Sequence, residues 1–295
     1  MNYQWYPGHM TKAIRQMQED MKLIDLVIEL IDSRIPMSSR NPLIDDLAKN
    51  KSRLILLNKM DLADEKSMKE WQAYFEEKGF FVASIDARNK KSVRSIDTVI
   101  EKACATKRER DARRGIKNRP IRAMVVGIPN IGKSTFINTY AGKASAKTGN
   151  RPGVTKGKQW IKINKNVELL DTPGILWPKF EDQTIGLHIA AIGAIRDEIM
   201  QKEELAMEVI SLLIKHYPGC LNRKYQIDEE GTQYELLDKI AVSRNCLKSG
   251  GIHDIQKAAT FFLDDFRSAA LGPMSLEFVK DYEEIEGKEN ESGRK

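Results

Sequence analysis

The chain has 295 residues, of which 41% are hydrophobic and 31% are charged, and its formal net charge is +6. This length allows two domains with cores of their own, and the composition is that of an ordinary globular protein. No apolar run approaches the roughly 20 residues of a membrane-spanning helix, and the first residues lack a secretory signal pattern. We therefore expect a cytoplasmic protein without a membrane segment.

The charge is distributed unevenly along the chain. Residues 1–178 carry 33 Lys and Arg against 20 acids, a net charge of +13, whereas residues 179–295 carry 15 against 22, a net charge of −7. A polyanionic partner is therefore expected to meet mainly the first part. On charge alone, a solvated basic face remains the alternative.

Predicted helices and strands alternate through the first hundred residues. Apolar runs without polar alternation are typical of strands buried on both faces, and helices between such strands predict a mostly parallel sheet covered on both sides. Helices are expected at 11–22, 42–49, 65–78 and 95–105, and strands at 23–31, 53–57 and 80–84.

A candidate base-reading motif, Asn58-Lys59-Met60-Asp61, directly follows the strand at 53–57. The Asp61 carboxylate can accept hydrogen bonds from both the ring N–H and the exocyclic amine of guanine. Adenine lacks this donor pair and would leave a buried carboxylate unpaired. Alone, the tetrapeptide could equally be a solvated loop at a strand end.

A strongly basic segment, residues 107–122, joins this half of the chain to the next predicted strand. It holds eight Lys and Arg, opposed only by Glu109 and Asp111. Two interpretations stay open: a solvated helix and linker, or a contact with nucleic acid.

A phosphate-binding loop is predicted at 127–135, Gly-Ile-Pro-Asn-Ile-Gly-Lys-Ser-Thr, between the apolar run 123–126 and a helical segment from Phe136. Backbone N–H groups of such a loop and of the following helix bind phosphate oxygens, and Lys133 adds a positive charge. The Ser134 hydroxyl can ligate Mg²⁺. Together with the guanine-reading motif, the loop predicts GTP rather than ATP as the ligand.

Residues expected to sense the γ-phosphate follow the loop. Thr155 lies in a run, 143–165, with seven Lys and Arg and no acid, and is a candidate second Mg²⁺ ligand on a switch loop. A predicted hairpin, 158–163 and 167–170, leads into Asp171-Thr172-Pro173-Gly174. Asp171 is expected to reach Mg²⁺ through water, and the Gly174 N–H to meet the γ-phosphate. Closure of the switch loop that contains Thr155 on the γ-phosphate would reshape the basic surface of this run. The nucleotide state would then control the affinity for a phosphate backbone.

The order of the motifs is permuted, because the guanine reader precedes the phosphate loop by 69 residues. With the opening Trp5-Tyr6-Pro7-Gly8-His9-Met10, the chain resembles the ribosome biogenesis GTPase A (YlqF-like) family of circularly permuted GTPases over nearly its whole length. The resemblance implies an α/β fold, a circularly permuted P-loop GTPase domain followed by a small all-α domain that binds ribosomal RNA.

The resemblance also implies roles for individual residues. Many GTPases carry a water-orienting glutamine where this chain has Ile175, and the family likeness points to His9 as its substitute, with Lys133 and Thr155 completing the catalytic set. A structural or RNA-contacting His9 is the alternative. Mg²⁺ is the expected cofactor, and Asn130 is a candidate ligand for K⁺. The expected GTP contacts are Asn58, Lys59, Met60, Asp61, Asp86, Ala87, Asn130, Ile131, Gly132, Lys133, Ser134, Thr135 and Gly174.

The contact at Asp86 and Ala87 is the one that departs from the family pattern. A backbone N–H there is expected to contact the guanine oxygen, but the family usually shows small polar residues and glycines nearby. This chain has Arg88-Asn89-Lys90-Lys91 instead.

After Pro178 the pattern becomes purely helical. Helices are predicted at 183–195, 203–216, 233–247, 254–271 and 275–284. We therefore expect three parts: a GTPase domain at 1–178, a helical domain at 179–285 and a disordered tail at 286–295.

The leading hypothesis from the resemblance is a GTP-hydrolysing assembly factor for a late step of large ribosomal subunit biogenesis. It would bind the precursor, rRNA and ribosomal proteins, as a monomer in the GTP state, be stimulated by it, and leave as the GDP form. The alternatives are a permuted GTPase acting on another RNA or on the small subunit, and a nucleotide-gated scaffold with incidental hydrolysis.

Overall fold

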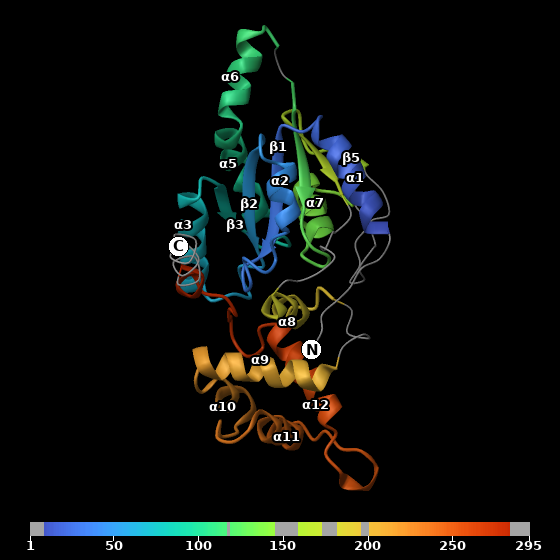
Figure 1. The fold of residues 1–295 in the computed structure, drawn as a ribbon, viewed down its shortest axis with the longest axis vertical. Coiled ribbons are helices and arrows are strands. Elements are labelled where there is room, and N and C mark those ends of the chain that lie inside the picture. Colours follow the sequence, from blue (N-terminus) through green and yellow to red (C-terminus); the bar gives the residue numbers. More distant parts are fainter. Residues whose placement is uncertain (1–8, 117–118, 145–158, 173–181, 196–200, 284–295) are drawn as a thin grey trace, which may run out of the picture.

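The computed structural model describes residues 9–116, 119–144, 159–172, 182–195 and 201–283. A sheet flanked by helices forms one end of the molecule, and a group of helices forms the other (Figure 1). Among the described helices, none combines the length and the apolar character needed to cross a membrane.

The sheet has six strands in the order β3-β2-β1-β4-β6-β5. The first five of these are parallel, and β5 at the edge runs antiparallel to β6. The strands are β1 (Leu26–Asp32), β2 (Ser52–Asn58), β3 (Phe81–Ser84), β4 (Ile121–Val126), β5 (Gln159–Lys162) and β6 (Val167–Asp171). The predicted mostly parallel sheet is confirmed.

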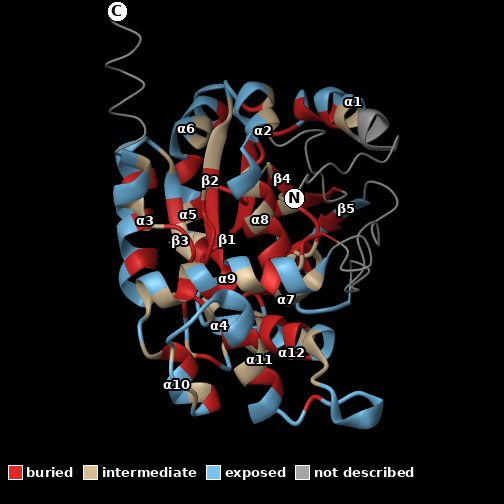
Figure 2. Cartoon of the chain, turned by 60° about the horizontal axis from the view of Figure 1, so that its bottom comes forward, coloured by how far each residue is buried: buried red, intermediate tan, exposed pale blue. Residues whose placement is uncertain are grey.

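Both faces of the sheet are covered, as predicted. Every residue of β1 is buried, and its alternate side chains point to opposite layers. On one face, Leu26, Ile28 and Leu30 pack in the same core as residues of α5 (Ile96–Ala103) and α7 (Lys133–Ala141). On the other face lie α1 (His9–Met21), α2 (Pro42–Leu47) and α3 (Glu65–Glu77). Figure 2 shows the buried strands between helices that are exposed on their outer sides.

The sheet order brings the two motif-bearing strands together. β1 pairs with β2 on one side and with β4 on the other, so the loops after β2 and β4 leave the same edge of the sheet. Ligand sites of open α/β sheets lie at this carboxyl edge. The permuted chain therefore places its guanine-reading motif and its phosphate loop at one edge.

Some boundaries differ from the sequence prediction. β1 begins at Leu26 because Leu23 is exposed on the turn after α1. The helix predicted at 95–105 is part of a series of three, α4 (Lys90–Arg94), α5 and α6 (Ala105–Arg113). Asn89 caps α4 by accepting from Lys91 N and Ser92 N. The β5–β6 hairpin is confirmed.

The helical region contains α8 (Gln183–Ala191), α9 (Lys202–His216), α10 (Cys220–Tyr225), α11 (Gln233–Ser243) and α12 (Ile255–Arg267). α9 packs against α8, α11 and α12 through buried side chains such as Leu205, Val209 and Leu213. The short helix α10 was not predicted. The predicted domain boundary at 178 and the predicted tail fall outside the described residues.

The prediction of a helix over 275–284 is wrong in its first part. Residues 279–283 are helical, but the residues just before them are not. This segment crosses back to the sheet end of the molecule, where Met274 N donates to Leu62 O and Leu276 N donates to Arg34 O. Two of its backbone N–H groups thus donate to loops at the sheet end of the molecule, and these bonds compete with the hydrogen bonds of a helix.

Glu277 joins this returning segment to both halves of the molecule. Its buried carboxylate accepts from Met37 N at 2.7 Å, from Ser38 N at 3.0 Å, and lies 3.0 Å from His188 Nδ1 of α8. Its backbone carbonyl accepts from Trp71 Nε1 of α3 at 3.1 Å. The helical region is therefore tied to the sheet by buried polar contacts.

Candidate nucleotide site

The loop after β4 has the backbone of a phosphate-binding loop. Gly127 has φ +152°, and a Cβ at this position would lie 2.6 Å from Leu30 O of β1, so the close approach requires glycine. Gly132, with φ +102°, is the left-handed residue at the start of α7. The first N–H groups of a helix have no partner inside it. Together with the positive end of the helix dipole, they make this end of α7 suited to a phosphate.

Lys133 is held inside this loop by backbone oxygens. Its Nζ donates to Gly127 O and Ile128 O, both at 2.9 Å, and the side chain is buried. Burial lowers the pKa of Lys133 to about 8, although the carboxylate of Asp171 opposes the shift. Anionic phosphate would restore the charge that burial penalises.

Asp171, at the end of β6, has a buried carboxylate that a bound cation would stabilise. Its Oδ1 is buried and has no hydrogen-bond partner among the described residues. Burial raises the pKa of the Asp171 carboxyl to about 6, and Lys133 only partly offsets this. A hard divalent ion prefers such oxygen ligands. Asp171 and the Ser134 hydroxyl therefore fit a Mg²⁺ site. Thr155 and Gly174 lie outside the described residues.

Asn58 links the base-reading loop to the phosphate loop. Its side chain is 1% exposed, its Nδ2 donates to Ile131 O at 2.8 Å, and its Oδ1 accepts from Ala87 N at 3.0 Å. One side chain thus joins the ends of β2, β3 and β4. The Ala87 N–H is already engaged by Asn58, so the expected contact with a guanine oxygen would have to share this hydrogen.

Lys59 is oriented by a buried carboxylate that the sequence analysis did not include in the site. Lys59 Nζ lies 3.0 Å from Asp32 Oδ2, and Arg34 binds the same carboxylate through Nε and Nη2 at 2.9 and 2.8 Å. These two cations hold the pKa of Asp32 far below its usual range despite complete burial. The position of Asp32 at the end of a buried strand is the sequence signal that could have revealed it.

Asp61, the predicted guanine reader, is engaged by a residue that the motif does not contain. Arg88 Nη2 donates to Asp61 Oδ2 at 2.6 Å, and Arg88 Nε donates to Asp86 Oδ1 at 3.0 Å. The arginine remains 66% exposed on its side chain. The unusual residue after Ala87 thus supplies a counter-ion to the predicted guanine-reading carboxylate.

Asn130 connects the phosphate loop to the helical region. It lies in the left-handed conformation, with φ +57°, and its Nδ2 donates to Gly193 O at 3.0 Å, just after α8. The amide oxygen is the atom that a potassium ion would use. Met60 lies in the loop after β2, and Thr135 lies in the first turn of α7. His9 is the first residue of α1, and its side chain falls outside the described part.

Comparisons with known proteins agree with this arrangement. A family model described as "50S ribosome-binding GTPase" matches residues 122–243. Ribosome biogenesis GTPase A of Bacillus cereus is 47% identical over 285 residues, 96% of this chain and 96% of the relative. Ribosome biogenesis GTPase A of Thermotoga maritima is 30% identical, over 94% of this chain and 95% of the relative.

A solved structure is also similar along most of the chain. GNP-bound YlqF from T. maritima has a TM-score of 0.65 and 28% sequence identity, and the match covers 90% of this chain and 98% of that one. The similarity thus includes both the sheet and the helical region.

Proposed function

Since the chain belongs to the ribosome biogenesis GTPase A family, we propose that it is a GTP-hydrolysing assembly factor for a late step of large ribosomal subunit biogenesis. In this proposal it binds the immature subunit in the GTP state and is released after hydrolysis. The main support for GTP as the ligand is the pair of hydrogen bonds from Asn58 to Ile131 and Ala87. These bonds join the predicted guanine-reading and phosphate-binding loops.

The site residues have distinct roles in this proposal. Asp61 accepts from the guanine N–H groups after Arg88 has moved from it, and selects GTP because adenine offers no matching donors. Lys133 and the start of α7 hold the phosphates. Ser134, Thr155 and Asp171 would hold Mg²⁺, the last through water, and Asn130 would hold K⁺. When bound, these cations neutralise charge on the phosphates.

Hydrolysis requires a group that positions water, and Ile175 cannot do so. We assign this role to His9, which belongs to the Pro7-Gly8-His9-Met10 motif. An imidazole can accept a proton from water or orient it by a hydrogen bond. The stimulation expected from the ribosomal subunit would then come from placing His9 against the nucleotide.

Contacts between the nucleotide loops and the helical region support coupling of the nucleotide state to subunit binding. Asn130 donates to Gly193 O. Arg34, which shares Asp32 with Lys59, donates through Nη1 to Arg267 O of α12 at 3.2 Å. Arg267 in turn donates to Ala190 O and Ala191 O at the end of α8. A nucleotide that moves Asn130 or Lys59 would therefore act on α8 and α12.

The decisive experiment is pelleting with separated, salt-washed ribosomal subunits in the presence of GDP or a non-hydrolysable GTP analogue. The expected result is binding to the large subunit, stronger with the GTP analogue. Exclusive binding to the small subunit would favour the alternative of a permuted GTPase with another RNA target. Equal binding with both nucleotides would contradict release after hydrolysis.

The second measurement is GTP turnover with and without large subunits, for the wild type and His9→Ala. We expect stimulation by the subunit in the wild type and its loss in His9→Ala. If subunits give no stimulation, a nucleotide-gated scaffold becomes the better description. If His9→Ala hydrolyses GTP normally, the role of His9 is lost while the GTPase assignment stands.

A further inference from the structure

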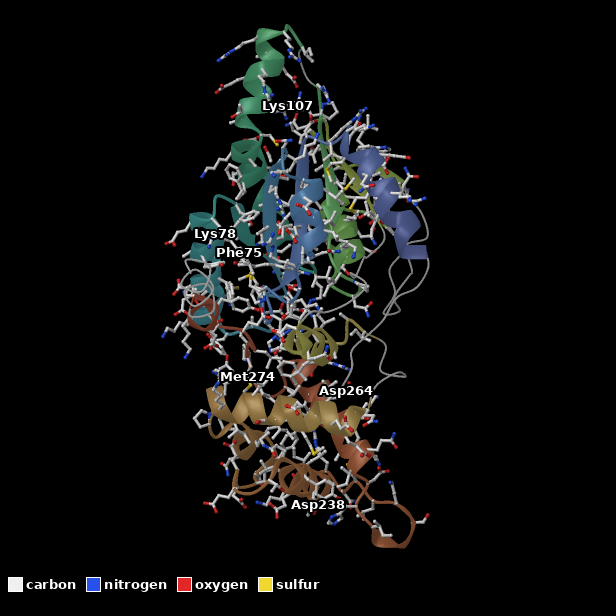
Figure 3. The ribbon with its side chains drawn as sticks, in the orientation of Figure 1. Phe75, Lys78, Lys107, Asp238, Asp264 and Met274 are labelled. Atoms are coloured by element: carbon white, nitrogen blue, oxygen red, sulfur yellow. The ribbon has the colours of Figure 1, made fainter. Side chains whose placement is uncertain are left out.

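Helix α6 projects from the molecule, and it contributes neither an apolar side chain to the core nor a residue to the nucleotide site. It extends beyond the amino edge of the sheet, at the far end from the helical region (Figure 1), and Figure 3 labels Lys107 on it. It packs against α5, and the only buried residue of α6 is a charged one, Asp111. A helix that is polar on all sides contributes little hydrophobic stabilisation to a fold.

Two acids at α6, Asp111 and Asp25, are neutralised by nearby cations. Lys107 binds Asp111 within the helix and lies 3.8 Å from Asp25, and Arg119 lies 3.6 Å from the same Asp25 carboxylate. Arg108 donates to Arg119 O at 3.1 Å. These contacts fasten the helix to the edge of the sheet and leave Glu109 as its one exposed acid.

Three further arginines remain exposed: Arg110, Arg113 and Arg114. None of them forms an ion pair within the described part of the chain. Their spacing of three and four residues places them on one side of the helix, where like charges repel by about 0.2–0.5 kcal/mol per pair. The helix dipole offsets part of this repulsion, because Arg110 and Arg113 lie in the last turn and Arg114 is the C-cap residue. An unpaired cluster of this kind is suited to an external polyanion.

The same edge of the sheet carries further exposed cations. Lys22 precedes β1, and Lys165 lies in the turn that leads into β6. Because β1, β4 and β6 are parallel, their amino ends meet at one edge. The exposed large apolar side chains here are Ile116, beside the arginines, and Leu23, beside Lys22, and they are separate from each other in the sequence. A protein interface normally has an apolar, desolvated centre, whereas contacts with a phosphate backbone need only cations.

We propose that this basic edge, formed by Lys22, Arg110, Arg113, Arg114 and Lys165, binds the phosphate backbone of structured RNA. The proposal rests on the proposed function and assigns part of the RNA contact to a surface away from the all-α region. The nucleotide loops lie at the opposite, carboxyl edge of the sheet. The basic edge therefore acts as an anchor whose affinity for RNA does not depend on whether GTP or GDP is bound.

The test compares Arg110→Ala/Arg114→Ala with the matched control Lys66→Ala/Lys69→Ala, which removes two exposed cations from α3. The probes are protein-free rRNA of the large subunit and the salt-washed subunit itself. For the arginine variant, the slope of log K against log salt should become shallower by about two. Affinity for rRNA at 0.1 M salt should fall on the order of tenfold to a hundredfold. The control should match the wild type.

GTP turnover without RNA should be unchanged in both variants, which shows that they are folded. An arginine variant that binds rRNA with wild-type affinity and salt slope would overturn the proposal. So would a variant that binds rRNA normally but the subunit weakly, because this result indicates an acidic protein partner. A wild type that binds neither subunit, but binds rRNA with the arginine-dependent salt slope, would instead refute the proposed function and leave the basic edge in place.

Discussion

The bridge made by Asn58 gives a prediction with a calculable size. In Asn58→Ala, Ile131 O and Ala87 N lose their partner in a part of the protein where Asn58 itself is 1% exposed. Leaving a buried donor or acceptor unsatisfied costs about 1–3 kcal/mol. Two such groups, partly relieved by relaxation of the loops, predict a loss of about 2–4 kcal/mol in the free energy of unfolding.

The assay is urea unfolding of the nucleotide-free protein, fitted with a common dependence on denaturant. Asn50→Ala, on the exposed loop between α2 and β2, is the control and should change stability by less than about 0.5 kcal/mol. Asn58→Asp distinguishes the two bonds. Its carboxylate can still accept from Ala87 N, but it places a buried negative charge against Ile131 O instead of a donor. We therefore expect it to be at least as unstable as Asn58→Ala.

The nucleotide affinity should fall together with the stability, because the loops that read the base and the phosphates are no longer held to each other. Calorimetric titration with GDP measures this. If Asn58→Ala loses less than about 1 kcal/mol of stability and keeps wild-type affinity for GDP, other contacts position the loops and our explanation of the shared pocket is wrong.

Three further predictions follow from other contacts of the site and of the returning segment. Arg88→Ala should speed the association of GDP, because the base no longer displaces an arginine from Asp61; equal rates in stopped-flow mixing would contradict this. The pKa of Lys133 is about 8 in the ligand-free protein. Phosphate favours the charged amine, so calorimetry should show GDP affinity falling as pH rises above 8, with proton uptake on binding. Glu277→Ala, which leaves the buried N–H of Ser38 and the half-buried N–H of Met37 unpaired, should lower stability by about 3–5 kcal/mol in urea unfolding, whereas Glu283→Ala, an exposed control, should not.

Much of the fold could be predicted from local sequence. The apolar runs at β1, β2 and β4 are buried on both faces, and such runs are recognisable without knowledge of their partners. The two loops were predictable because each is a contiguous motif whose residues act through their own backbone or a nearby charge. The two loops meet at one edge because β1 lies between β2 and β4. The sequence indicated this strand order only through the resemblance to a known family.

The parts that could not be predicted depend on contacts between distant residues. Glu277 accepts from Ser38 across 239 positions, and this contact favours an extended backbone where local propensity favoured a helix. The pairing of Arg88 with Asp61 likewise joins the ends of two strands. The sequence around Glu277 does not indicate that Ser38 is its partner, and the sequence around Arg88 does not indicate Asp61. The six-residue helix α10 was missed because so short a helix shows little periodicity.

The position of β1 between β2 and β4 also has a consequence for synthesis of the protein. As the chain leaves the ribosome, β1 and β2 can pair early, but the other side of β1 stays open until β4 has been made. At typical translation rates, the roughly 90 intervening residues take about 5–20 s. During that interval the nascent chain presents an unpaired strand edge, a known hazard for aggregation.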